Sequence, residues 1–227
     1  MQNFDLTDGI ELEHDLNDAY FEKLSRLGQP ISFEVNQSIF HQGEAASWVY
    51  VLLSGSVKAI RSDENGHETL LKIHQVGSLI GLSALRPKAI RDATCIATQT
   101  VRAVEFSRNR FFDLMREDGE LGVLLVQLLL KRQQLLHTRV SDVTGLSVEQ
   151  RLARVLVQMH VEMSAYRNAQ DQAELRISHE ELAALVFSRR QYITAILRTF
   201  SKMGLIENKR LRLRILNAEA LADIVSG

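Results

Sequence analysis

Apolar positions change their period along the 227-residue chain. From residue 31 to residue 106, short apolar runs alternate with turn residues, and Asn65-Gly66 is a strong hairpin signal. The runs that predict strands are residues 48–53, 57–60, 69–73, 94–97 and 101–106. Many short strands at this spacing indicate a small β-barrel or sandwich.

A helical period precedes this region. Five apolar residues repeat at helical spacing and predict a helix that Gly28 and Pro30 end. They are Leu16, Tyr20, Phe21, Leu24 and Leu27.

A long helix is predicted over residues 121–143, with two apolar faces. The first is a coiled-coil seam at spacings of 4 and 3, made of Gly122, Val126, Leu129, Gln133, Leu136, Val140 and Val143. The second consists of Leu121, Leu125, Leu128 and Leu135. We expect the second face to pack on the barrel and the seam to pack on a second copy of the chain. The alternative is a helix buried inside a monomer. Residues 143–147 break the pattern and are the expected hinge.

Two helix starts stand close together near the C-terminus. Ser178 with Glu181 and Ser188 with Gln191 each match a capping box. The first box predicts a helix over residues 179–186. The second predicts a helix that ends at Gly204 and buries Ile193, Ile196, Leu197 and Phe200.

The exposed face of the second helix is polar and basic. It carries Arg189, Arg190, Gln191, Thr194 and Arg198, and Lys202 follows. Two helices joined by a short turn, with a basic face on the second, indicate a helix-turn-helix that reads the DNA major groove. The alternative is an ordinary helical hairpin with a solvated basic face.

Strict alternation follows at residues 210–215. It predicts a hairpin wing with Arg210, Arg212 and Arg214 on one face. The opposite face would carry Leu211, Leu213 and Ile215.

The balance of charge agrees with a DNA-binding C-terminal part. Residues 146–227 carry 12 Lys and Arg against 9 Asp and Glu, whereas residues 1–145 carry 15 against 19. No signal peptide or membrane-spanning segment is apparent, so we expect a cytoplasmic protein with no membrane partner. The single cysteine, Cys95, indicates packing, with a redox switch as the minor alternative.

Enzyme chemistry finds no support in the residue pattern. The seven histidines are dispersed, and no Gly-x-Ser-x-Gly motif, glycine-rich phosphate loop or metal-ligand spacing occurs. A ligand-binding subunit without a DNA role is a third class, which the complete helix-turn-helix and wing disfavour.

Several segments together resemble the cyclic-AMP receptor protein / fumarate-nitrate-reduction regulator (CRP/FNR) superfamily. They are residues 40–44 (Phe-His-Gln-Gly-Glu), 50–57, 76–82, 90–94 and 146–152, with the helix-turn-helix. The resemblance implies an α+β fold with three parts. They are a jelly-roll β-barrel effector domain over residues 1–118, a dimerisation helix over 119–143 and a winged helix-turn-helix over 144–227. It also implies a homodimer on palindromic double-stranded DNA, and contact with RNA polymerase if the protein is an activator.

Departures from the family pattern concern the effector. Receptors of cyclic AMP carry Glu where this chain has Leu82, and Ser where it has Asp92 beside Arg91. The hydroxyl pair that faces adenine falls on Leu136 and His137. We therefore predict no tight cyclic-AMP binding. The iron–sulfur cysteine cluster of other members is absent as well.

An apolar pocket with one cation remains between the barrel and the long helix. We expect it to be lined by Ile80, Gly81, Leu82, Leu85, Arg91, Asp92, Leu128, Leu129, Leu136 and His137. Such a pocket suits an apolar organic acid or aromatic anion. The alternatives are a filled core with no effector, and a haem bound through His74 or His137. No metal site is expected.

The helix-turn-helix, which we call the reader because it is expected to read DNA bases, also departs from the family pattern. Arg190 can pair with guanine O6 and N7, whereas Gln191 replaces a family Glu and suits adenine. Ala195 stands where members carry a hydrogen-bonding residue, and Phe187 stands where many carry Gly in the turn. A palindrome different from the family's usual sites is therefore expected.

Overall fold

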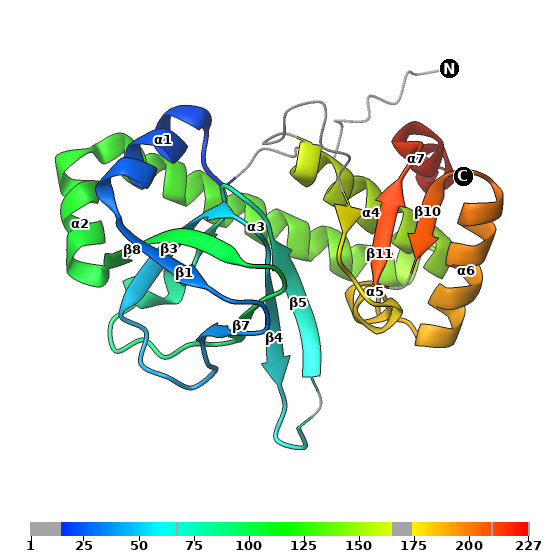
Figure 1. Ribbon diagram of the computed structural model, residues 1–227, viewed down its shortest axis with the longest axis horizontal. Helices are drawn as coiled ribbons and strands as arrows, with labels where there is room; N and C mark the ends of the chain where they lie inside the picture. Colours follow the sequence, from blue (N-terminus) through cyan, green and yellow to red (C-terminus); the bar gives the residue numbers. More distant parts are fainter. Residues whose placement is uncertain (1–14, 67, 165–173, 210, 227) are drawn as a thin grey trace. The chain divides into compact units, whose positions relative to one another are not determined.

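The structure is a computed structural model that describes residues 15–66, 68–164, 174–209 and 211–226 (Figure 1). It divides into two compact units. The N-terminal unit is His14–Gln134, and the C-terminal unit is built on Leu135–Gly227. Helix α3 (Gly119–Gly145) contributes residues to both.

Two four-stranded antiparallel sheets form the N-terminal unit. One has the order β1-β8-β3-β6 and the other β2-β7-β4-β5. Their strands are β1 (Gln29–Phe33), β2 (Ser38–Phe40), β3 (Trp48–Ser54), β4 (Val57–Ser62), β5 (Glu68–His74), β6 (Leu79–Ile80), β7 (Thr94–Ala97) and β8 (Val101–Ser107). A 3₁₀ helix, η1 (Leu82–Leu85), follows β6. All five strands predicted from the sequence are confirmed, and Asn65-Gly66 lies in the β4–β5 turn.

Strand β3 is buried on both faces, because the unit has two apolar cores. Tyr50 and Leu52 face the second sheet and join a core that contains Phe40, Ala59 and Ala97. Val49 and Val51 belong to the other core, which lies between this sheet and the helices and which we call the outer core. Alternation along one strand thus supplies both cores.

Helices α1 (Asp18–Leu27), α2 (Arg108–Glu117) and α3 cover the outer core. Helix α1 ends at Gly28, as predicted, but the glycine is required by space rather than by a left-handed backbone. A Cβ there would lie 2.5 Å from the Cβ of Val104 on β8. Pro30 lies inside strand β1.

The long helix runs two residues past its predicted end. Leu121, Leu125 and Leu128 are buried in the outer core, as expected for its second face. The seam is exposed in the single chain: Val126 is 57 % exposed and Val140 is 72 % exposed. Leu129 and Leu136 are exposed as well.

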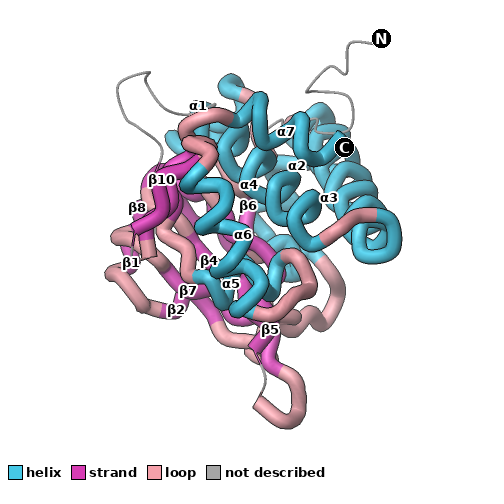
Figure 2. Tube along the Cα trace, turned by 90° about the vertical axis from the view of Figure 1, so that its right-hand side faces the viewer, coloured by secondary structure: helices cyan, strands magenta, loops and turns pink. Residues whose placement is uncertain are grey.

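The C-terminal unit combines helices with a small sheet. It contains α4 (Val148–Ser164), β9 (Glu174–Leu175), α5 (His179–Leu185), α6 (Arg190–Lys202), β10 (Ile206–Lys209), β11 (Arg212–Ile215) and α7 (Ala218–Ser226). The sheet order is β10-β11-β9. Helices α5 and α6 lie side by side in both ribbon and tube views (Figures 1 and 2). No helix in the described ranges is long and apolar enough to span a membrane.

Candidate nucleic-acid interface

Helix α5 begins with the predicted capping box. Ser178 Oγ accepts from the Glu181 amide at 3.1 Å, and the Ser178 amide donates to Glu181 Oε2 at 2.8 Å. Two otherwise unpaired amides at the start of the helix are satisfied in this way. Leu182, Ala183 and Leu185 are buried.

The second predicted capping box is wrong. Helix α6 begins at Arg190, with Arg189 as its N-cap residue and no side-chain cap. Phe187 has φ +51°, and the Ser188 amide donates to the Ala183 carbonyl at 2.9 Å. The left-handed backbone at Phe187 forms the turn between the helices. Ser188 therefore lies one position before Arg189, the N-cap residue of α6. Phe187 adopts a backbone conformation that favours glycine, and its ring is exposed.

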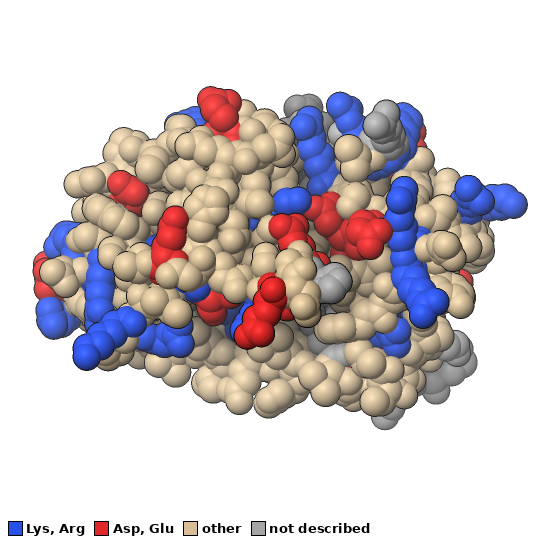
Figure 3. All heavy atoms as spheres, turned by 90° about the horizontal axis from the view of Figure 1, so that it is seen from below, with Lys and Arg blue, Asp and Glu red and all other residues tan. Residues whose placement is uncertain are grey.

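Helix α6 has one buried and one exposed face. Ile193, Leu197 and Phe200 are fully buried, and Ile196 is half-buried. The exposed side chains include Arg189, Arg190, Gln191, Tyr192, Ala195, Arg198 and Lys202. Figure 3 shows Lys and Arg side chains standing out from the C-terminal unit, at the right of the view.

Arg189, Arg190 and Gln191 lie at the start of α6. The helix macrodipole gives this end a partial positive charge, which adds to the two guanidinium charges. The side chains of Arg189, Arg190 and Arg198 make no hydrogen bond or ion pair with other described residues. Their donors therefore remain available for phosphates or base edges.

Thr194 is the exception on this face. Its hydroxyl donates to the Arg190 carbonyl at 3.0 Å and lies 2.9 Å from His179 Nδ1. His179 was missed at the sequence level, because a residue at the start of α5 carries no local sign of a contact fifteen positions further on.

The wing is a hairpin of β10 and β11. Leu213 and Ile215 are buried and Arg212 is exposed, as the alternation predicts. The prediction for Leu211 is wrong: it has φ +58° in the turn, and its side chain is exposed. The turn breaks the alternation before β11 begins. Arg210 lies outside the described residues.

Glu207 brings a negative charge to the wing. It pairs with Lys209 at 2.8 Å and with Arg214 at 2.9 Å. The hydrogen bond and charge of Lys209 lower the pKa of Glu207, with help from Arg214. Arg214 is thus held within the wing, whereas Arg212 lies on its exposed surface.

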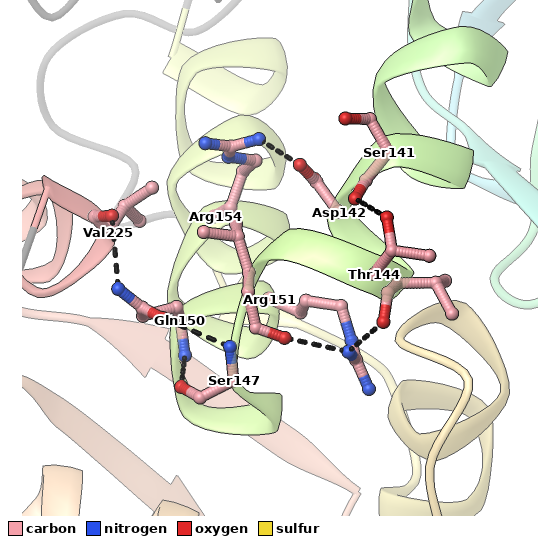
Figure 4. A network of polar contacts seen from close by, with 10 residues as sticks. Ser141, Asp142, Thr144, Ser147, Gln150, Arg151, Arg154 and Val225 are labelled. Atoms are coloured by element: carbon pink, nitrogen blue, oxygen red, sulfur yellow. Dashed lines mark hydrogen bonds and ion pairs between the residues drawn. The ribbon is translucent and has the colours of Figure 1, made fainter.

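The hinge is narrower than predicted, because α3 continues to Gly145 and α4 begins at Val148. Ser147 and Gln150 form a capping box at the start of α4, with hydrogen bonds of 3.2 and 3.0 Å (Figure 4). Asp142 of α3 pairs with Arg154 of α4. Only residues 146 and 147 separate the two helices.

Arg151 joins this hinge to the reader. Its Nη1 donates to the carbonyls of Leu146 at 2.9 Å and Val143 at 3.3 Å. Its Nε donates to the carbonyl of Val186, at the end of α5, at 3.0 Å. One planar guanidinium therefore contacts the end of α3, the hinge and the helix-turn-helix.

The predicted effector residues of the N-terminal unit divide between its two cores. Ile80 belongs to the core between the sheets, whereas Leu128 is buried in the outer core with Leu82 and Leu85 packed against it. Leu129 is exposed on α3, and Asp92 is exposed. Leu136 and His137 lie in the C-terminal unit and are exposed there.

Arg91 is buried and held by the barrel itself. Its Nη2 donates to the Trp48 carbonyl at 2.7 Å, and its Nη1 donates to the Gly81 carbonyl at 2.9 Å. The guanidinium also lies over the Phe40 ring, 4.0 Å from its centre. Gly81 has φ +78°, and a Cβ there would lie 2.8 Å from Arg91 Nη1. Burial lowers the pKa of Arg91.

Two other reactive side chains are packed into the barrel. Burial raises the pKa of the Cys95 thiol to about 12, as suits a packing residue. Burial lowers the pKa of His74 to about 3. Within the described ranges, no cluster of three or more His, Cys, Asp or Glu side chains could hold a metal ion.

Comparisons with known proteins agree with both units. The chain matches the cyclic nucleotide-binding domain family over residues 30–118 and the Crp-like helix-turn-helix domain family over residues 150–224. It is similar to the CRP-like cAMP-activated global transcriptional regulator of Mycobacterium tuberculosis. The two are 26% identical over 203 residues, which cover 88% of this chain and 89% of that protein.

Solved structures show the same fold. A CRP/FNR family transcriptional regulator from Thermus thermophilus superposes with a TM-score of 0.69 at 23% identity, covering 88% of this chain and 99% of that one. FixK2 from Bradyrhizobium japonicum gives 0.73 at 14% identity, covering 87% and 96%.

The jelly-roll barrel, the helix-turn-helix with its wing, and these matches lead to one conclusion. The chain belongs to the CRP/FNR superfamily of DNA-binding transcription regulators.

Proposed function

We propose that this regulator binds a palindromic DNA duplex as a homodimer and discriminates among sequences through helix α6. The observation that carries the proposal is the exposed basic start of α6, where the side chains of Arg189 and Arg190 have no partner among the described residues. A helix of this kind enters the major groove with its N-terminal residues against base edges.

The side chains of α6 have distinct roles in this proposal. Arg190 pairs with guanine O6 and N7, and Gln191 pairs with adenine. Ala195 is exposed and cannot hydrogen-bond, which removes one base contact that relatives make. Phosphate contacts come from Ser188, Arg189, Arg198, Lys202, Arg210 and Arg212, whereas the Ser178 hydroxyl donates to Glu181 at 2.9 Å.

Homodimer formation rests on the exposed seam of α3. Gly122, Val126, Leu129, Gln133, Leu136 and Val140 repeat at coiled-coil spacing, and the apolar ones stay exposed in the single chain. If the seams of two copies packed against each other, this apolar surface would be removed from water. We assign residues 119–143 to dimerisation, with the effector domain before and the reader after.

If a small-molecule effector controls this regulator, we propose that it is not cyclic AMP. The Mycobacterium tuberculosis relative is named as cAMP-activated. In this chain Leu82 provides no carboxylate, and exposed Asp92 repels a phosphate beside Arg91. An apolar or aromatic anion suits the remaining residues better.

A regulator without an effector is the second candidate, and the position of Arg91 favours it. Arg91 is buried, and each of its terminal nitrogens already donates to a backbone carbonyl of the barrel, although its Nε has no partner among the described residues. Haem finds less support, because His74 is buried and His137 is exposed in a different unit.

Control of DNA binding would act through the hinge. A ligand that favours one alignment of the two α3 helices shifts the population of that alignment. Arg151 and the Asp142–Arg154 pair transmit the position of α3 to α4 and α5. Such a regulator acts in the cytoplasm and contacts RNA polymerase if it activates transcription.

Selection of bound duplexes from a random pool tests the function. The proposal predicts one enriched palindrome and a steep fall of affinity as salt rises. No enrichment at moderate salt, with and without added metabolites, would contradict it. A thermal-shift screen of cyclic nucleotides and aromatic acids tests the effector, because a bound ligand raises the melting temperature.

A further inference from the structure

Three elements of the reader meet at the imidazole of His179. Its Nδ1 lies 2.9 Å from Thr194 Oγ1 on α6, and its Nε2 lies 3.2 Å from Asn208 Nδ2 on β10. The ring itself belongs to the first residue of α5. One side chain therefore links both helices of the helix-turn-helix to the wing.

The partners fix where the proton of the ring lies. The Thr194 hydroxyl has one proton, which it donates to the Arg190 carbonyl, so it must accept from His179 Nδ1. The amide nitrogen of Asn208 only donates, so His179 Nε2 must accept. In this arrangement His179 Nδ1 donates to Thr194 and His179 Nε2 accepts from Asn208, so both ring nitrogens have a partner.

This arrangement removes the Thr194 hydroxyl as a hydrogen-bond donor in DNA recognition. The hydroxyl proton and one acceptor position are both used inside the protein. The side chain of Thr194 then offers a base no donor, and its methyl group suits the methyl group of thymine.

We propose that His179 is a positioning residue that sets DNA specificity: it withholds the Thr194 hydroxyl from the bases and holds the wing against α6 through Asn208. The inference rests on the proposed function, because it assumes that α6 reads bases. It adds that one base pair is recognised by apolar contact and that the phosphate contacts of the wing depend on one imidazole.

Two conservative substitutions separate the two contacts. In His179→Asn the amide nitrogen takes the place of Nδ1, which keeps the donor to Thr194 but leaves Asn208 without its acceptor. In His179→Gln the amide oxygen takes the place of Nε2, which keeps the acceptor for Asn208 but releases Thr194. Both variants are compared with wild type by anisotropy on the selected duplex and on its single-base variants, over a range of salt.

The expected results are opposite for the two variants. His179→Asn keeps the base preferences and lowers the salt slope by about one, as for one lost phosphate contact. His179→Gln keeps the salt slope and reduces the thymine preference at one base pair by about fivefold or more. Thermal unfolding confirms that both variants are folded.

Identical effects of the two variants, or a protonated Nε2 in the nitrogen NMR spectrum of the wild-type imidazole, would overturn the inference. The spectrum is recorded on wild type without DNA, so it tests the hydrogen bonds of His179 even if a variant misfolds. Failure of the proposed function looks different. In that case wild type itself prefers no sequence, and the inference falls with it.

Discussion

Arg151 Nε donates to the carbonyl of Val186 at 3.0 Å, across thirty-five positions of sequence. The same guanidinium holds the carbonyls of Leu146 and Val143. Val186 is the C-cap residue of α5, and Val143 lies in the last turn of α3. The contact therefore connects the predicted dimerisation helix with the turn that orients α6.

Replacing Arg151 by Lys should loosen that turn. Lys keeps the charge but lacks the planar fork that reaches three carbonyls, so we expect a loss of about 2 kcal/mol in the free energy of unfolding. Hydrogen exchange of the Phe187 and Ser188 amides should accelerate. Arg154→Lys is the matched control, because Arg154 bonds to Asp142 and not to the turn. Equal exchange in both variants would contradict the role of Arg151.

Arg190 and Arg212 should differ in what they contribute to DNA binding. Arg190→Ala should cost about 1–3 kcal/mol at one base pair and relax specificity there, because a bidentate base contact is lost. Arg212→Ala should weaken binding to all duplexes alike and lower the salt slope by about one, because Arg212 lies on the exposed surface of the wing. Competition binding with single-base variants measures both effects. If the two variants behaved alike, the assigned roles would be wrong.

A charge in the α3 seam should separate the proposed dimer. Leu129→Asp places an unpaired carboxylate where apolar side chains would meet, so sedimentation should show monomers at concentrations where wild type is dimeric. Gln127→Asp is the matched control, since Gln127 is an exposed polar residue of the same helix outside the seam. Dimers in both variants would mean that the copies meet elsewhere.

His74 should make the N-terminal unit sensitive to acid. Burial lowers its pKa to about 3, whereas an unfolded histidine titrates near 6.5. The unfolded chain therefore takes up a proton first, and stability falls as pH decreases from about 6.5 toward 3, by at most about 1.4 kcal/mol per pH unit.

Replacing His74 by Leu removes this proton uptake. Urea denaturation at several pH values should then show a flatter dependence between pH 4.5 and 6.5 than wild type. Against the cost of burial, the charges of Lys72 and Arg132 lower the pKa of Asp15, so Asp15 contributes an acid sensitivity at lower pH. An unchanged slope in His74→Leu would show that other groups dominate.

Local patterns were predicted well from the sequence. The Ser178–Glu181 box, the five strands and the exposed seam depend on neighbours a few positions apart, so their residues alone determine them. Ser188 shows the limit: the same local signal failed because left-handed Phe187 shifted the start of α6.

Contacts between distant residues could not be predicted in this way. The links from His179 to Thr194 and Asn208, and from Arg151 to Val186, exist only once the helices have packed. Likewise, the sequence placed Arg91 in a pocket, whereas its terminal nitrogens bond to backbone carbonyls of the barrel. Residue type indicated a cation at this place, but only the fold shows what it already binds.

The spacing of half-sites tests the central claim, sequence reading by a dimer, most directly. Anisotropy compares the selected palindrome with the same duplex lengthened by about five base pairs at its centre, which turns one half-site to the opposite face of the DNA. We predict that this change weakens binding by about a hundredfold or more, because the two α6 helices can no longer enter both grooves together. Equal affinity for the two duplexes would contradict the account.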